Sequence, residues 1–309
     1  MPKIHLDTDL GGDMDDLCAL AMLLRWEDLQ FSGITTVAEA GGKRAGFTRY
    51  VLEMEGKRDI PIAAGAEVSK GFYRYPQLGY PDEERYWAAR ITPLPNPIDE
   101  ALLLLKQSIE QQATLIAIGP FTNLYLLDLK YPGILMQANL FLMGGYVFPV
   151  RDGFPPWGNE TDWNIQVDVR SARHVIEHSN PTLIPLSVTV ETALRRAYLE
   201  ELRNAGRIGQ LIARQAEAFA LDEKNETRYG ETCAGLPSDI INFQHDSLAC
   251  AIALGWNDAV EIREFPLLLE EKDGWLHERV DPRGRPVPVV TKINGPAFNE
   301  FWLNKIVKR

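Results

Sequence analysis

Five aspartates stand within ten residues near the start of the chain, between a short apolar segment and a longer apolar run. They are Asp7, Asp9, Asp13, Asp15 and Asp16. Residues 4–6 precede them and residues 17–24 follow. This order predicts a strand, a glycine-containing turn and a helix, with the acids at the carboxyl end of the strand. Open α/β sheets bind ligands at that edge, so the stretch predicts a fold class and a site together.

The crowding of these carboxylates is a chemical problem, because like charges this close repel one another. Each acid needs a positive partner, hydrogen bonds or a raised pKa, and a hard cation satisfies several acids at once. Aspartate is also favoured in the first turn of a helix, but that does not explain Asp7 and Asp9, which precede the glycines. The stretch therefore predicts a metal site with oxygen ligands. Calcium tolerates irregular geometry in such sites, whereas magnesium demands a stricter octahedron.

The charge balance narrows the class of partner. The 309 residues carry a net charge of −11, and 45% of them are hydrophobic. Such a chain can bury a full core, while its acidic surface disfavours nucleic acid and anionic membranes. The three cysteines, Cys18, Cys233 and Cys250, are far apart and indicate neither a disulfide framework nor a zinc site. Because the acids begin at position 7, we expect no signal peptide and a cytoplasmic protein.

Strand-like and helix-like segments alternate along the chain. Short apolar segments predict strands at residues 31–37, 60–65, 115–120, 140–145 and 182–190. Helices are predicted at residues 45–55, 98–112, 122–130, 169–178, 197–219 and 247–256, and at the C-terminus. We expect an α/β fold with a mostly parallel, Rossmann-like open sheet flanked by helices, formed by one domain over residues 1–309. A small antiparallel extension is predicted near the C-terminus, around the turn at residues 272–274.

Residues 67–96 are irregular and rich in proline, tyrosine and glycine. A segment of this length without clear periodicity is commonly a functional loop or lid, and the alternative is a packed surface excursion. A second polar break is expected at residues 222–232. The sequence leaves the role of the first loop open.

Four predicted strand ends carry polar residues or glycine. They are the ends at Asp7 and Asp9, at residues 118–120, at Gly144 and Gly145, and at residues 244–246. Carboxyl ends of parallel strands share one edge, so these ends can converge on one pocket. Asp246 is then a distant partner of the N-terminal acids, or simply the cap of the helix that follows. His245 is either a proton donor, because histidine titrates near neutral pH, or a buried structural histidine.

A compact polar and aromatic set follows the strand at 140–145. It consists of Asn159, Asp162, Trp163 and Asn164. Such groups can bind sugar hydroxyls, with the tryptophan supplying an apolar face.

The ordered motifs resemble those of the calcium-dependent nucleoside hydrolases, the inosine-uridine-preferring nucleoside N-ribohydrolases. The resemblance rests on DTDLGGDMDDLCAL at the start, GITTV at 33–37, IPIAAG at 60–65, AIGPFTNL at 117–124, FLMGG at 141–145, DWNIQVD at 162–168, HDSLA at 245–249 and VTKINGPAFNEFW near the C-terminus. It implies hydrolysis of the N-glycosidic bond of a ribonucleoside to free base and ribose, in purine or pyrimidine salvage. It also implies a homodimer or homotetramer.

The resemblance further implies a metal half of the site. Asp9, Asp16 and Asp246 would bind calcium through their carboxylates, and Ile118 would add its main-chain carbonyl. Asp9 would also act as general base on a calcium-bound water. Asp7 would support the site from behind. These roles fit the reaction, since calcium can orient and activate water for attack on an oxocarbenium-like sugar.

The sugar and base contacts are implied in the same way. Asp15 would hold the ribose 2′-hydroxyl, while Asn164 and Asp162 would contact the 3′- and 5′-hydroxyls. Asn159 would join them. His245 would face the leaving base, which needs a proton or a hydrogen bond as it departs.

The chain departs from the family pattern at several positions. Two residues are inserted between Gly11 and the Asp15–Asp16 pair, and in the alternative alignment Asp13 takes the place of Asp15. Glu39 stands where the family usually has asparagine after the second strand, and it can still touch the sugar or the metal. The sugar loop is shorter than usual. Asp162 stands where glutamate is usual.

The base half of the site matches the pattern less well. Tyr75, Tyr80, Arg228 and Tyr229 lie in the two loops that would cover the base, by position alone. The preference for purine or pyrimidine therefore does not follow from the sequence. Two alternatives remain open: a catalytically weak, calcium-dependent nucleoside- or ribose-binding homologue, and a haloacid-dehalogenase-type phosphohydrolase, which also opens with two aspartates at a strand end.

Overall fold

Within residues 1–74 and 84–308, which the computed structural model describes, nine strands form a central sheet in the order β10-β9-β11-β6-β5-β4-β1-β2-β3. The parallel strands are β1 (Lys3–Thr8), β2 (Gln30–Thr36), β3 (Ile62–Ala64), β4 (Thr114–Ala117), β5 (Asn139–Met143) and β6 (Pro181–Ile184). After β3 the chain returns to the other side of β1 to form β4. The strand order thus reverses between β1 and β4, which is where open α/β sheets bind ligands.

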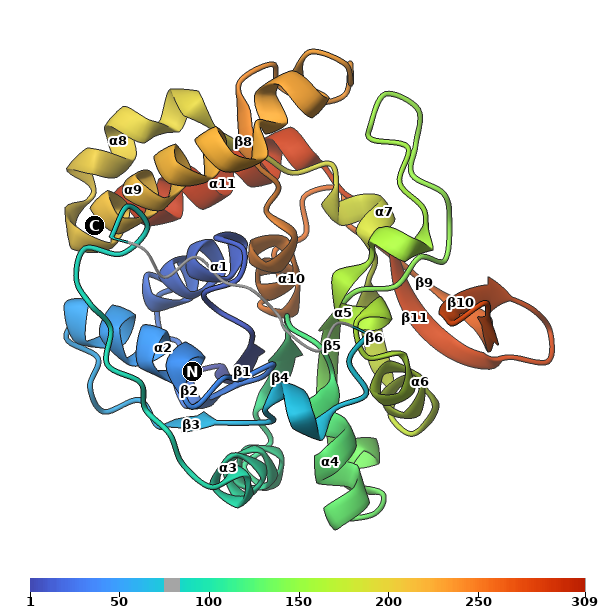
Figure 1. Cartoon of the computed structure of the whole chain (residues 1–309). Helices are drawn as coiled ribbons and strands as arrows, with labels where there is room; N and C mark the ends of the chain where they lie inside the picture. Colours follow the sequence, from blue (N-terminus) through green and yellow to red (C-terminus); the bar gives the residue numbers. More distant parts are fainter. Residues whose placement is uncertain (75–83, 309) are drawn as a thin grey trace.

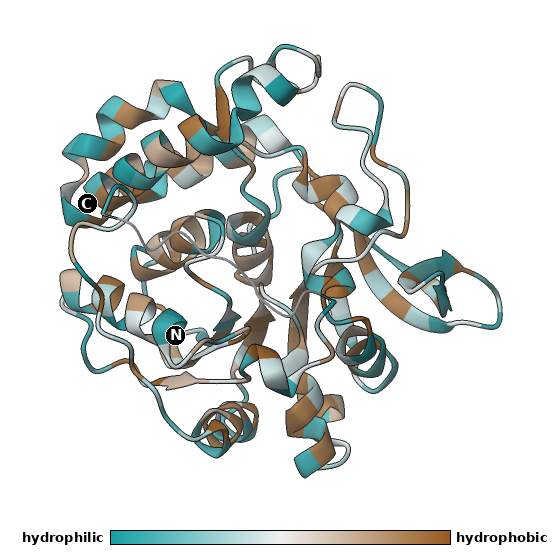
Figure 2. Cartoon of the chain, viewed as in Figure 1, coloured by the Kyte–Doolittle hydropathy of each residue, from teal (hydrophilic) through white to brown (hydrophobic). Residues whose placement is uncertain are grey.

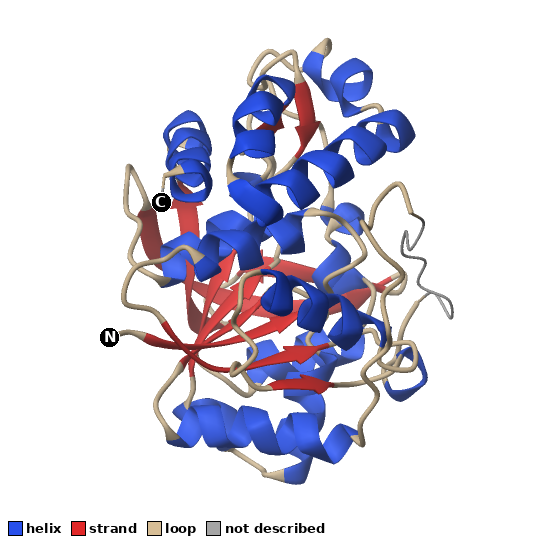
Figure 3. Cartoon of the chain, turned by 90° about the vertical axis from the view of Figure 1, so that its left-hand side faces the viewer, coloured by secondary structure: helices blue, strands red, loops and turns tan. Residues whose placement is uncertain are grey.

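Helices cover both faces of this sheet (Figures 1 and 3). One group is α1 (Asp15–Leu24), α2 (Lys43–Met54), α8 (Leu199–Asn204), α9 (Gly206–Glu223), α10 (His245–Ala253) and α11 (Gly295–Val307). The other is α3 (Ile98–Glu110), α4 (Thr122–Lys130) and α6 (Val169–Glu177). The short helices α5 (Trp163–Gln166) and α7 (Leu186–Thr189) follow β5 and β6. The expected architecture is therefore confirmed.

Two apolar cores lie on the two sides of the sheet, because successive residues of a strand point to opposite faces. On β4, Ile116 belongs to the core beneath α1 and α10, whereas Leu115 and Ala117 belong to the core beneath α3 and α4. Brown, hydrophobic residues accordingly mark the central strands in Figure 2. Burial on both faces holds the strand ends rigidly, which suits a site built on them.

The antiparallel extension predicted near the C-terminus is present. It consists of β9 (Glu261–Lys272), β10 (Trp275–Val280) and β11 (Arg285–Lys292), and β11 joins it to β6. Asp273 and Gly274 connect β9 to β10 with φ values of 53° and 78°. Two consecutive positive φ values suit a two-residue hairpin turn, and Asp-Gly is a favoured sequence for it.

Two segment predictions were wrong in detail. The strand expected at 182–190 ends at Ile184, and Leu186–Thr189 are helical instead. Pro185 lies at the break and has no N–H to donate to a neighbouring strand. The helix expected at 197–219 divides into α8 and α9 at Gly206, whose φ of 84° is open to glycine but strained for other residues.

One of the four polar strand ends does not lie on the central sheet. β8 (Ile240–Asn242), which precedes His245, pairs with β7 (Leu194–Arg195) in a separate antiparallel ribbon. The expected convergence at one sheet edge therefore applies to three strand ends. The polar residues after the fourth strand, His245 and Asp246, lie on the first turn of α10. Among the described residues, no helix is long and apolar enough to span a membrane.

The loop at residues 67–96 contains a single short 3-10 turn, Val68–Lys70, in its described part. Tyr75 and Tyr80, which we placed near the base by position, lie outside the described residues. Further along, Trp87 is buried and stacks on Phe47 of α2, with ring centroids 4.3 Å apart. This end of the loop is packed against the protein.

Candidate active site

A cavity of about 430 Å³ lies at the carboxyl ends of β1, β4 and β5, which are neighbours in the sheet. The expected site residues among its lining are Asp9, Asp13, Asp15, Asp16, Ile118, Asp162, Asn164, His245 and Asp246. The other lining residues are Gly12, Arg44, Met143, Trp157, Thr161, Trp163, Leu186 and Tyr229. Larger cavities elsewhere, of about 870 and 700 Å³, lie on the surface away from these acids.

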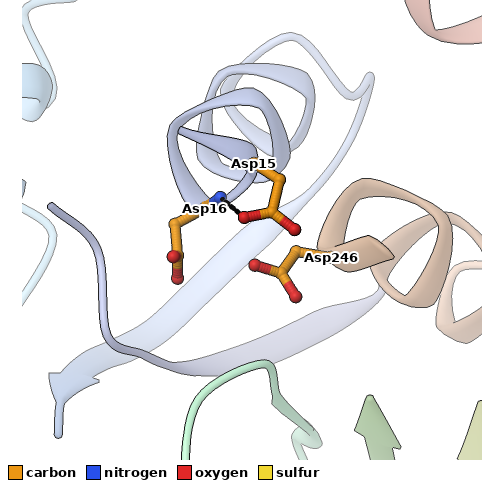
Figure 4. A group of neighbouring side chains, drawn as sticks. All are labelled: Asp15, Asp16 and Asp246. Carbon is orange, nitrogen blue, oxygen red and sulfur yellow. Dashed lines mark hydrogen bonds between the residues drawn. The ribbon is translucent and has the colours of Figure 1, made fainter. Parts of the chain in front are cut away.

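Three buried carboxylates face one another in this cavity. Asp15 and Asp16 lie on the first turn of α1, and Asp246 lies on the first turn of α10, which packs against α1. One oxygen of each carboxylate lies within 4.8 Å of the others (Figure 4). The fold thus brings acids from the two ends of the sequence to one point.

The electrostatics of this group favour a cation. Burial, and then repulsion from neighbouring acids, raises the pKa of Asp15, Asp16 and Asp246 well above the ordinary aspartate value. Asp9 is among those neighbours, and burial raises its pKa as well. Hard divalent cations take carboxylate and carbonyl oxygens as ligands. A buried, oxygen-only group whose members repel one another therefore fits such an ion.

Arg44 is a site residue that the sequence analysis missed. It is buried on α2, its Nε donates to the carbonyl of Ala38 at 2.9 Å, and its guanidinium also donates to the carbonyl of Asp9. Its positive charge opposes the rise in the pKa of Asp9 and Asp16. Nothing in the local sequence marks this arginine, because helices commonly carry exposed arginines and only the packing reveals its burial.

Asn164 connects two of the strand ends. Its side-chain amide donates to the carbonyl of Ile118 after β4 and to that of Met143 at the end of β5, both at 3.1 Å. The carbonyl of Ile118 is therefore held at the cavity wall. Asp162 caps α5 by accepting from the amide of Ile165 at 3.3 Å, and it also accepts from the amide of Gly145. Burial raises the pKa of Asp162 to about 6.

Three expected site residues, Glu39, Asn159 and Asp7, do not line the cavity. The buried carboxylate of Glu39 accepts from the amides of Ala45 at 2.8 Å and Arg44 at 3.3 Å, so it caps α2. Asn159 donates to the carbonyl of Leu276 on β10 at 3.1 Å.

Asp7 lies behind the cavity within β1. It accepts from Thr35 at 2.5 Å and from Asn123 at 2.7 Å, and burial raises its pKa to about 7. Asp13, by contrast, lines the cavity and accepts from Asn242 of β8 at 2.5 Å.

An aromatic wall surrounds His245 at the far end of the cavity. Its ring stacks on Phe243, with Trp157 and Tyr229 beside them. Its Nδ1 lies 2.7 Å from the hydroxyl of Thr189 on α7. Burial, which separates the imidazole from water, lowers the pKa of His245 to about 4. The imidazole is thus oriented by one hydrogen-bond partner and lies beside aromatic rings.

The model of the inosine-uridine preferring nucleoside hydrolase family matches residues 4–300. The chain belongs to that family. It is 30% identical to the non-specific ribonucleoside hydrolase RihC of Salmonella agona (strain SL483) over 224 residues, which is 68% of this chain and 69% of the relative.

Solved structures of nucleoside hydrolases share the fold. A plant nucleoside hydrolase superposes with a TM-score of 0.78 at 16% identity, covering 100% of this chain and 99% of its own. The purine-preferring ribonucleoside hydrolase of Gardnerella vaginalis gives a TM-score of 0.76 at 20% identity, covering 99% and 98%. Because the family model matches residues 4–300, which is almost the whole of this chain, the phosphohydrolase alternative is rejected.

Proposed function

We propose that this nucleoside hydrolase cleaves the N-glycosidic bond of a ribonucleoside and releases free base and ribose, with a divalent cation as cofactor. The observation that carries the proposal is the position of Asp246 beside Asp15 and Asp16, in the cavity that Asp9 also lines. A cavity of about 430 Å³ falls within the range of small-molecule sites.

We assign the cation to calcium. The carboxylates of Asp9, Asp16 and Asp246 and the carbonyl of Ile118 would hold it, and Asp15 lies close enough to share this role. Bound there, calcium would orient the sugar diol and lower the pKa of water. The shared oxygen chemistry and the burial of these groups support the assignment, because calcium accepts six to eight oxygen ligands in irregular geometry.

The remaining site residues act on the substrate. Asp9 accepts the proton of the attacking water, which needs a base within hydrogen-bond reach. Asp15 binds the ribose 2′-hydroxyl, and Asn164 and Asp162 bind the 3′- and 5′-hydroxyls. The surrounding carboxylates also stabilise the positive charge that develops on the ribose as the bond breaks. His245 donates a hydrogen bond to the departing base.

Asn159 and Glu39 remain expected substrate contacts. In the structure Asn159 donates to the carbonyl of Leu276, and Glu39 accepts from the amide of Ala45. We further propose, from the family resemblance, that residues 1–309 act as one domain in a cytoplasmic homodimer or homotetramer. Light scattering of the purified protein tests the assembly, and a monomeric mass would contradict it.

The function is tested with a panel of purine and pyrimidine ribonucleosides assayed for free base. We expect release that a calcium chelator abolishes and that added calcium restores. Asp9→Asn should lower kcat by about a thousandfold, the scale of losing a general base, while the control Asp152→Asn, at an exposed acid, should not. If nucleosides bind in a calcium-dependent manner but no base is released from any of them, the protein is the binding homologue instead.

A further inference from the structure

A second buried carboxyl group lies behind the wall of the cavity that carries Asp162. It belongs to Glu278 on β10, and the two residues are 2% and 3% exposed. The amide of Gly145 donates to Asp162, and the next amide along the chain, that of Tyr146, donates to Glu278 at 3.2 Å. Two carboxyl groups are therefore bonded to consecutive peptide units of the loop after β5.

The strand that carries Glu278 is fixed against the sugar loop. The side-chain amide of Gln166 donates to the carbonyl of Leu276 at 2.7 Å, and the amide of Leu276 donates back at 2.9 Å. Asn159 donates to the same carbonyl. Glu278 lies two residues further along β10, on the same face of the strand as Leu276, so these bonds fix its backbone against the loop that carries Asp162.

Within the part of the chain that the structure describes, no buried cation lies beside Glu278 to balance an ionised carboxylate. Its Oε1 is buried and has no hydrogen-bond partner among the described residues. Asp162 is an ionisable neighbour whose charge acts on it, and that charge is repulsive. The charged or titratable groups on β10 itself and on the segments packed against it are exposed or partly exposed: Arg74, Glu160, Arg170, Arg173, His174, Glu177, Glu261, Arg263, Glu264, Glu270, Glu271, Lys272, His277 and Arg279.

A buried carboxyl group in this position takes up a proton, because leaving an unpaired charge out of water costs more. We propose that Glu278 is a positioning residue that stays protonated, turns its hydroxyl toward Asp162, and thereby holds Asp162 in place as an anionic acceptor for the ribose. Burial, and then the charge of Asp162, raises the pKa of Glu278 to about 8, in agreement with that geometry. This role rests on the proposed function of the cavity.

The protonation state of Glu278 can be measured without any catalytic turnover. Infrared difference spectra between the wild type and Glu278→Gln, recorded at neutral pH, should show loss of one protonated-carboxyl band. The control Glu270→Gln, at an exposed acid on the neighbouring strand, should show no such loss. Absence of the band in the wild type would overturn the proposal even if base release is normal, whereas a wild type without base release contradicts only the proposed function.

Steady-state kinetics test the positioning. In the wild type, KM should rise about tenfold as pH passes through the pKa of about 8, with kcat less affected, because a second negative charge then displaces Asp162. Glu278→Gln, which stays neutral and keeps a donor, should remain within about twofold of the wild type at neutral pH and lose this alkaline rise. Glu278→Ala should raise KM at neutral pH. An identical KM profile in the wild type and Glu278→Gln would refute the positioning role.

Discussion

At the scale of single residues, the aspartates of the site differ in their partners rather than in their chemistry. Asp7 is held by Thr35 and Asn123, and Asp162 by main-chain amides. Asp15 accepts from the amide of Asp16 at 3.1 Å, but it also faces Asp246 across the gap between α1 and α10. Hydrogen-bond donors favour the charged form of a carboxylate, whereas neighbouring acids disfavour it. The carboxylates that face other acids are therefore the ones that call for a cation.

His245 offers a residue-scale prediction, because Thr189 is its hydrogen-bond partner. Thr189→Val keeps the shape of the side chain and removes the hydroxyl, so the imidazole loses its orientation. We expect kcat for natural nucleosides to fall about tenfold, the scale of one neutral hydrogen bond. The measurement is kcat with a nucleoside and with a nitrophenyl riboside, whose leaving group departs without a proton. Equal losses with both substrates would contradict a role at the leaving group.

The sequence located much of this site because the acids form an unusual pattern. Asp9, Asp15, Asp16 and Asp246 stand out by crowding or by their place before a buried helix, and the structure brings them to one cavity. Arg44 could not be found in this way, since its importance comes from burial beside residues far away in the sequence. Distinguishing residues that line the cavity from those bonded behind it likewise needed tertiary packing.

At the scale of elements, the ends of β1 and β4 approach so closely that the residue after Ile118 has no room for a side chain. A Cβ atom on Gly119 would lie 2.8 Å from a carboxylate oxygen of Asp9 and 2.8 Å from a methyl carbon of Val37. Real side-chain contacts are longer than this, so the glycine allows Asp9 to occupy its position. The alternation of strands and helices was predictable from periodicity, but this approach was not.

Gly119→Ala should therefore displace Asp9 and lower kcat/KM by at least about tenfold, since small displacements of reacting groups are costly. The matched control is Gly133→Ala, where the added methyl meets no atom within 4 Å, although its φ of 81° strains the backbone. The control should lose stability and keep its activity. Urea denaturation and base release measured on both variants separate the two effects, and full activity in Gly119→Ala would show that Asp9 tolerates the shift.

Two element-scale errors share one physical cause. The apolar run at 182–190 predicts a strand throughout, yet the edge of the sheet and Pro185 end it after four residues. The helical pattern at 197–219 is interrupted at Gly206 by a backbone conformation that periodicity does not reveal. Local patterns report which side of an element is buried, while its ends depend on what it packs against.

At the scale of the whole molecule, buried carboxyl groups couple folding to pH. An ordinary glutamate has a pKa near 4.5, and in the folded protein that of Glu278 is raised to about 8. Between these values the folded chain keeps a proton that the unfolded chain has released, so stability falls as pH rises. The contribution is fully present below the lower value and is lost above the upper one.

We expect the free energy of unfolding of the wild type to decline relative to that of Glu278→Gln across this interval, from about 4.5 to about 8. Urea denaturation of both proteins at a series of pH values, in the same buffer and metal concentration, gives the difference directly. The comparison cancels the other buried acids, which both proteins retain. A constant difference between the two proteins would mean that Glu278 does not change its protonation on folding.

The indole of Trp302, on α11, donates to the carbonyl of Cys18 at 3.1 Å in the core of the molecule. Cys18 lies one residue beyond Leu17 on the helix that begins with Asp15 and Asp16. The C-terminal helix α11 therefore packs against the helix whose first turn carries two of the site's acids. A change in the core at Trp302, far from the cavity, can thus alter the position of these acids without touching the substrate.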